Sequence, residues 1–157
     1  TMTDRAMAVA DRAQELDASV AVACIEWTEP LMVAGNWIPE MVSLAGGRNI
    51  FGEVGEHAPE LAWEEFLEAD PEVIILMPCG FDLKRAATEA GLLSSRPGWQ
   101  DLAAVRAGHV YATDANAYFN RPGPRLAESL EIMAEVLHPD VFQFGHENMG
   151  WQRVSAD

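Results

Sequence analysis

The sequence has few cysteines, few basic residues and no long apolar run. Its 157 residues include two cysteines, Cys24 and Cys79, which neither demand nor exclude an oxidising compartment. Ten Lys and Arg residues face 25 Asp and Glu residues, for a net charge of −15. This charge argues against binding to nucleic acid or to an anionic membrane surface, because both would repel the chain. The acidic surface is then either solvated or meets a basic partner.

Signals of export, membrane insertion and common catalytic sites are also missing. No apolar run approaches the ~20 residues of a membrane-spanning helix, and Thr1 opens directly into a charged amphipathic stretch. For an exported protein, we expect the sequence to begin after the export signal or after a removed amino-terminal part. The sequence holds no G-x-S-x-G, H-E-x-x-H, Walker or G-x-G-x-x-G motif. What remains is a chain of ordinary globular composition, with 49% hydrophobic residues and a length that suits one domain.

Helical and extended patterns alternate along the chain. Helical spacing is expected at 3–17, 37–45, 63–68, 82–90 and 121–137, with a short helical stretch at 99–105. Buried strands are expected at 19–25, 73–77 and 109–112, and 52–60 reads as an exposed loop. Gly46 and Gly91 are predicted to end their helices, and Asp82 to cap one. The alternation predicts an α/β fold: a three-layer lobe with a mostly parallel central sheet flanked by helices.

Aromatic loops follow all three predicted strands. Glu26-Trp27 follows the first strand, Cys79-Gly80-Phe81 the second, and the stretch from Asn116 to Arg121 the third. In parallel α/β sheets, ligands bind at the carboxyl ends of the strands. The three loops should therefore converge on one edge and form a binding site.

Each candidate side chain has a plainer structural alternative. Trp37 lies at a predicted helix start, beside the Ile38/Met41/Val42 stripe, so it either faces a ligand or packs in the core. Trp27 and Phe81 bind a ligand or pack at the rim of the core. The pair Tyr118 and Phe119 offers flat aromatic surface, while Arg121 either contacts a ligand or bonds loop carbonyls.

Metal and catalytic sites are not predicted. The four histidines show no ligand spacing to each other or to either cysteine, so we expect no metal and no cofactor. Cys24 and Cys79 are either buried thiols or a disulfide. A small α/β enzyme using Cys79 or Glu26 is the alternative from another functional class, and the prediction is a binding protein.

Four segments, in order, resemble one family. The segments are "AGNWIPEMVSLAGGRNIF", "WEEFLEADPEVIILMPCGFDL", "PGWQDLAAVRAGHVYATD" and "AYFNRPGPRLAESLEIM". Together they are similar to the C-terminal lobe of substrate-binding proteins that serve ABC importers of cobalamin and ferric siderophores, most closely the cobalamin branch. The resemblance covers roughly residues 19 to 138. It implies a remnant of an interlobe helix at 1–17, a ligand-binding lobe at 18–138 and an aromatic tail of unassigned role at 139–157. The alternative for residues 1–17 is an ordinary amino-terminal helix that packs on the sheet.

The resemblance also implies a function, a location and partners. The chain would help clamp a corrinoid, a large planar ring bearing amides, for delivery to an ABC permease outside the cytoplasm. A ferric siderophore or haem is the alternative ligand of the same class. In the family a surface Glu on each lobe pairs with Arg residues of the permease, and Glu40 is the candidate here; otherwise it is an ordinary solvated acid. With no amino-terminal lobe visible, we expect either a homodimer of the isolated lobe or coverage of its edge by the tail.

Overall fold

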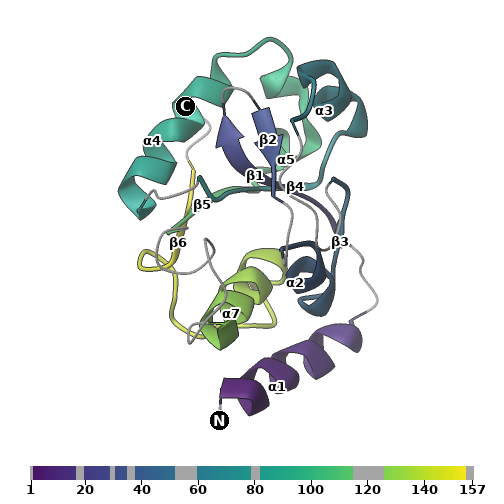
Figure 1. Ribbon diagram of the computed structural model, residues 1–157, viewed down its shortest axis with the longest axis vertical. Helices are drawn as coiled ribbons and strands as arrows, with labels where there is room; N and C mark the ends of the chain where they lie inside the picture. Colours follow the sequence, from purple (N-terminus) through teal and green to yellow (C-terminus); the bar gives the residue numbers. More distant parts are fainter. Residues whose placement is uncertain are drawn as a thin grey trace.

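The computed structural model describes residues 2–16, 20–28, 31–34, 38–51, 60–78, 82–114 and 126–154 (Figure 1). Its helices are α1 (Met2–Gln14), α2 (Ile38–Leu44), α3 (Trp63–Ala69), α4 (Leu83–Ser94), α5 (Ala103–Ala107) and α7 (Leu126–Leu137), with a 3₁₀ turn η1 (Trp99–Asp101). Its strands are β1 (Val20–Thr28), β2 (Leu31–Val33), β3 (Gly47–Asn49), β4 (Val73–Leu76), β5 (Val110–Thr113) and β6 (Trp151–Arg153).

The described strands form one mixed sheet. Its order is β2-β1-β4-β5-β6, with β3 paired to β1 beside β2. The pairs β1–β3, β1–β4 and β4–β5 are parallel, whereas β1–β2 and β5–β6 are antiparallel. Helices cover both faces of the sheet (Figure 1). The predicted α/β lobe with a mostly parallel central sheet is confirmed.

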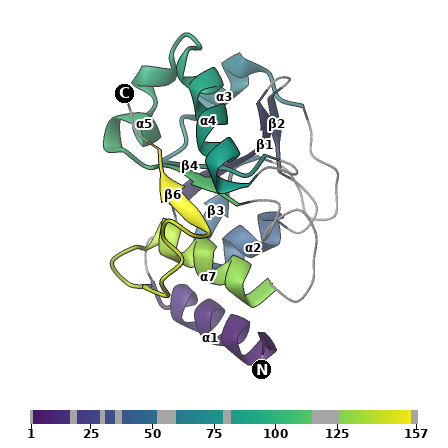
Figure 2. The same ribbon diagram turned by 90° about the vertical axis from the view of Figure 1, so that its left-hand side faces the viewer.

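Alternation of side chains along the strands divides the core into two halves. Cys24 of β1 and Ile75 of β4 pack with α1, α2 and α7 on one face, while Ile25 and Ile74 pack with α3, α4 and α5 on the other. Burial of each such aliphatic side chain stabilises the fold by roughly 1.5–3 kcal/mol. Helix α1 lies beyond α7, on the side away from the sheet (Figures 1 and 2). It is therefore packed on helices and not on the sheet itself.

Two of the three helix-end predictions are correct. Gly46 follows α2 with φ +87°, and the Asp82 side chain accepts a hydrogen bond from the Arg85 backbone N–H at the start of α4. Gly91 does not end α4, which continues to Ser94. A Cβ at Gly91 would meet nothing within 4 Å, so this glycine is an exposed mid-helix position. The helix continues past it because Leu93 is fully buried in the core.

Strands also occur in two segments that were not predicted to be extended, the predicted loop after Ile25 and the unassigned tail. Glu26 and Trp27 lie within β1, which continues to Thr28 and forms a hairpin with β2. Residues beyond Pro139 form β6 and bury Phe142 and Trp151 in the α7 half of the core. The described part of the tail is thus integral to the lobe, and the homodimer stays a prediction.

Candidate functional site

The carboxyl ends of the parallel strands lie side by side at one edge. Ile25 of β1 is in register with Leu76 of β4, and Leu76 with Ala112 of β5. Beyond this line the Met77 N–H donates to the Ile25 carbonyl at 2.8 Å, and the buried Thr113 hydroxyl donates to the Leu76 carbonyl at 2.9 Å. These bonds fix the points from which the chain leaves the sheet. The convergence of the three aromatic loops at this edge stays a prediction, because the loops after β4 and β5 lie largely outside the described residues.

The first strand extends past the other two as a hairpin with a β-bulge. Ile25 pairs with Val33 and Trp27 with Met32, which leaves Glu26 as the extra residue of β1. Bulges re-aim side chains and occur often beside functional sites. The bulge therefore interrupts the alternation of side chains at the position where β1 projects beyond the sheet edge.

Glu26 is a partly buried acid at this bulge. Its burial raises the pKa of the Glu26 carboxyl above the ordinary value of 4.5, because desolvation disfavours the charged form. The oxygen atoms of a carboxyl group accept hydrogen bonds from ligand N–H and O–H groups. Trp27 beside it is also partly buried. The two residues together offer a polar group and a flat apolar surface, which is the combination that ligand pockets use.

A side-chain hydrogen bond fastens the hairpin to α4. The Thr28 hydroxyl, on a residue that is 6% exposed, donates to Glu89 Oε2 at 3.0 Å. The sequence analysis missed Thr28, Glu89 and Thr113. A threonine at the end of an apolar run hints at such a bond, but its partner on α4 is 61 residues away and no local pattern indicates it.

All six of the other predicted ligand residues lie outside the described residues. These are Trp37, Gly80, Phe81, Tyr118, Phe119 and Arg121, together with Cys79. Gly80 and Phe81 come soon after Pro78, which follows β4, and Tyr118 comes soon after Asp114, which follows β5. Their roles stay predictions.

Glu40 and Cys24 are both described. Glu40 is exposed in the first turn of α2, a helix that buries Ile38, Pro39, Met41 and Val42. Cys24 is a free thiol, and complete burial raises its pKa to about 12. A thiol that stays protonated and enclosed is not a nucleophile.

The described part of the chain holds neither a candidate metal site nor a candidate membrane-spanning helix. No group of three or more His, Cys, Asp or Glu side chains there could hold a metal ion. None of the helices described is both long enough and apolar enough to cross a bilayer.

A hollow of about 360 Å³ lies away from the strand ends, against α4, β5 and β6. Small residues of α4, Ala87, Ala90 and Gly91, line one side, and Trp99 and Arg153 line others. It has the volume of a small-molecule pocket. Neither Glu26 nor Trp27, the two predicted ligand residues that the structure describes, lines it.

Comparison with known proteins establishes the family. The sequence pattern of the family described as "Periplasmic binding protein" matches residues 2–117, which is more than half of the chain. The chain therefore belongs to the periplasmic binding protein family.

Individual relatives and solved structures agree with this assignment. The Vitamin B12-binding protein of Vibrio cholerae (strain ATCC 39315 / El Tor Inaba N16961) is 32% identical over 107 residues, covering 68% of this chain and 35% of that protein. The structure of the periplasmic vitamin B12 binding protein BtuF of Vibrio cholerae superposes with a TM-score of 0.67 at 23% identity, covering 90% of this chain and 52% of that one. A periplasmic heme binding protein from Pseudomonas aeruginosa gives 0.67 at 22% identity, covering 88% and 50%.

Coverage is partial in every one of these cases. The chain spans about a third of the length of the curated relatives it matches and about half of the solved chains. The lobe described here therefore corresponds to one part of those larger proteins.

Proposed function

We propose that this chain is the C-terminal ligand-binding lobe of an ABC-importer substrate-binding protein that captures cobalamin or a related corrinoid. The observation that carries the proposal is the similarity to vitamin B12-binding proteins over about two thirds of the chain. The aligned strand ends with a bulged, partly buried Glu26 and Trp27 support it from the structure.

The edge suits a ligand that is large, flat and fringed with amides. Aromatic faces stack on planar rings, and Trp27 supplies one such surface. The proposed contributions of Trp37, Tyr118 and Phe119 would enlarge it. The Glu26 carboxyl would accept hydrogen bonds from amide N–H groups of the ligand. Arg121, Gly80 and Phe81 complete the proposed contact set, by hydrogen bonding and by close backbone approach.

Delivery of the ligand requires a permease, and tight binding requires a second lobe on the other side of the ligand. Glu40 is exposed on α2 and is proposed to pair with an Arg residue of an ABC permease at the outer face of the cytoplasmic membrane. One lobe alone offers one wall, so the chain by itself should bind weakly. Helix α1 is proposed as the segment that leads to the other lobe.

Haem is the second candidate ligand, favoured by the similar fold of the Pseudomonas aeruginosa heme binding protein. A ferric siderophore is the third member of the same class. Catalysis is not proposed, because the described thiol, Cys24, is enclosed and protonated. The enzyme alternative then depends on Cys79 or Glu26. Alkylation of Cys79 that abolishes turnover of a small-molecule substrate would favour it.

The ligand class is tested by visible absorption. The two-lobed protein is mixed in turn with cobalamin, haem and a ferric hydroxamate, desalted, and scanned in the visible range. The expected result is that the corrinoid spectrum stays with the protein. If the protein retains haem or the ferric complex but not cobalamin, the ligand is that compound and not a corrinoid. If it retains none of the three, the proposed binding function is contradicted.

A further inference from the structure

Two buried acids interrupt the apolar face of α7. Glu131 and Glu135 are each 5% exposed, although their neighbours Leu130, Ile132 and Met133 belong to the core. One turn separates them, so they lie on the same side of the helix. A buried carboxylate is costly unless hydrogen bonds satisfy it. The hydrogen-bond partners of Glu131 and Glu135 therefore identify the segments that this side of α7 contacts.

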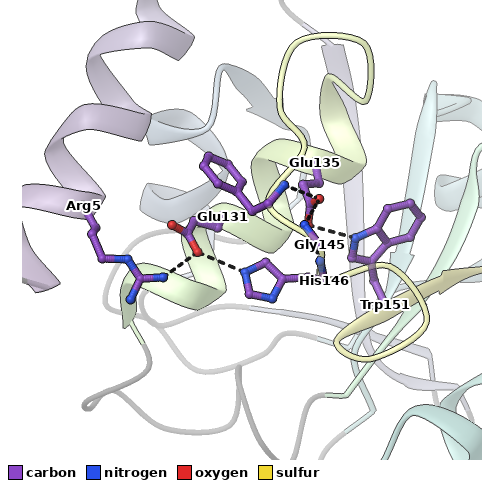
Figure 3. Close-up of polar contacts among 7 residues, drawn as sticks. Arg5, Glu131, Glu135, Gly145, His146 and Trp151 are labelled. Atoms are coloured by element: carbon purple, nitrogen blue, oxygen red, sulfur yellow. Dashed lines mark hydrogen bonds and ion pairs between the residues drawn. The ribbon is translucent and has the colours of Figure 1, made fainter.

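Glu135 holds the segment that follows α7. Its Oε2 accepts hydrogen bonds from the backbone N–H groups of Phe144 at 2.8 Å and Gly145 at 3.2 Å. Its Oε1 accepts from the His146 N–H and the Trp151 indole N–H, both at 3.3 Å (Figure 3). Three successive N–H groups thus surround one carboxylate, an arrangement typical of anion-binding loops. Residues 144–151 are therefore attached to α7 at both ends, by the N–H groups of 144–146 and by Trp151.

Glu131 joins this segment to α1. Its Oε1 accepts from Arg5 Nη2 at 2.7 Å and contacts His146 Nε2 at 3.0 Å (Figure 3). The Glu131 side chain is 7% exposed, the His146 side chain 17% and the Arg5 side chain 51%. One buried oxygen atom therefore connects the first helix, α7 and the carboxy-terminal segment.

A second contact links the same segment to α1 two turns later. The Arg12 guanidinium lies over the Phe142 ring, 5.3 Å from its centroid. Phe142 is 2% exposed and stacks with Phe144. Residues 142–151, called the strap below, thus contact α1 near its start and near its end. The residue spacing from Arg5 to Arg12 places both cations on the same side of the helix.

We propose that the strap locks α1 onto α7, with Glu131 as the connecting group, so that α1 moves as part of this lobe. Apolar contacts of Val9 and Ala13 hold the helix against the lobe, and the polar contacts fix its direction. If α1 leads to a second lobe, a consequence that rests on the proposed function, α1 stays with this lobe when the two lobes move. Motion of one lobe relative to the other would then leave the α1–α7 packing intact.

Amide hydrogen exchange on this chain tests the lock without any ligand. His146→Ala changes a strap residue, yet it should raise the exchange rate of α1 amides. A hydrogen bond to a charged group contributes about 1.5–3 kcal/mol, so the expected rise is about tenfold or more. Exchange in β1 and β4 should not change. Gln143→Ala, an exposed position in the same strap, is the matched control and should leave α1 unaffected.

Two further variants keep the test decisive if the strap variant folds poorly. Arg5→Gln removes the exposed side of the same contact and should raise α1 exchange to a similar extent. Glu131→Gln should do the same, whereas Glu128→Gln, a partly exposed acid on the same helix, should not. Unchanged α1 exchange in the Arg5 and Glu131 variants would overturn the proposal. An increase with Arg5→Gln but none with a folded His146→Ala would also overturn it, because the strap would then be uncoupled from α1. Failure of ligand binding leaves each of these outcomes unchanged.

Discussion

Gly46 is the position where a single methyl group should be most informative. It follows α2 at φ +87°, and a Cβ there would lie 2.9 Å from His138 Nε2 and 3.3 Å from both the Cβ and the carbonyl oxygen of Ala13. These atoms belong to the ends of α7 and α1, so Gly46 is the point where the ends of three helices meet. His138 Nε2 is buried with no hydrogen-bond partner among the described residues. Gly46→Ala must therefore strain the backbone and displace a packed imidazole.

The two costs can be separated and summed. A left-handed conformation costs an L-residue roughly 1–2 kcal/mol, and overpacking a core site costs about 1–3 kcal/mol. The sum, about 2–5 kcal/mol, is a large part of the 5–15 kcal/mol that stabilises a typical domain. For a chain of this length it should lower the Tm by about 5–15 °C.

Thermal unfolding of three glycine variants separates the cost of backbone strain from the cost of overpacking. Gly108→Ala has φ +78° but open space around the new Cβ, so it should show the strain alone. Gly91→Ala, in the middle of α4 with open space, should raise stability by about 0.5–1 kcal/mol because alanine is the better helix former. A Gly46→Ala protein that melts within about 1 °C of the parent would show that neither the backbone strain nor the overpacking is present.

Three other predictions concern the edge and the core. In a Cys79→Ser background, Cys24 should resist alkylation at pH 8 until the protein unfolds, because its thiol is enclosed and its pKa is about 12; rapid native labelling, followed by mass spectrometry, would contradict this. Since burial raises the pKa of Glu26, the folded state binds its proton more tightly, and this contribution to stability is lost as pH rises above 4.5 through the folded pKa. Glu26→Gln should therefore gain stability relative to the parent between pH 4 and pH 7 in denaturant titrations, and a constant difference would count against the burial. Thr28→Val should cost about 1 kcal/mol or more by removing the bond to α4, whereas Thr88→Val, at an exposed helix position, should change little; equal effects in chemical denaturation would refute a special role for the buried bond.

The parallel sheet could be predicted because its central strands are apolar runs. Residues 21–25 and 73–77 are buried on both faces, so their sequence carries no polar alternation and reads directly as an enclosed strand. Helix α2 could be predicted for a related reason: Ile38, Met41 and Val42 recur at helical spacing, and the structure buries all three.

Features set by long-range contacts could not be predicted. Glu26 interrupts the apolar run of β1, and only pairing with β2 shows that the strand continues through a bulge. The three residues of β6 are too few for a periodic signal, and β5 supplies their order. No local pattern indicates that Glu131 and Glu135 are buried, since their hydrogen-bond donors lie up to 126 residues away. Local sequence patterns indicate whether a segment is buried. The structure at these positions depends instead on which distant segment packs or pairs with them.

Calorimetric titration of the two-lobed protein with cobalamin shows whether this lobe helps bind a corrinoid. Saturable heat at one ligand per protein is expected. We also expect weaker binding in Trp27→Ala, because Trp27 is a proposed ligand contact and is only partly buried. The absence of heat with cobalamin, under conditions where a ferric siderophore titrates normally, would contradict the corrinoid assignment.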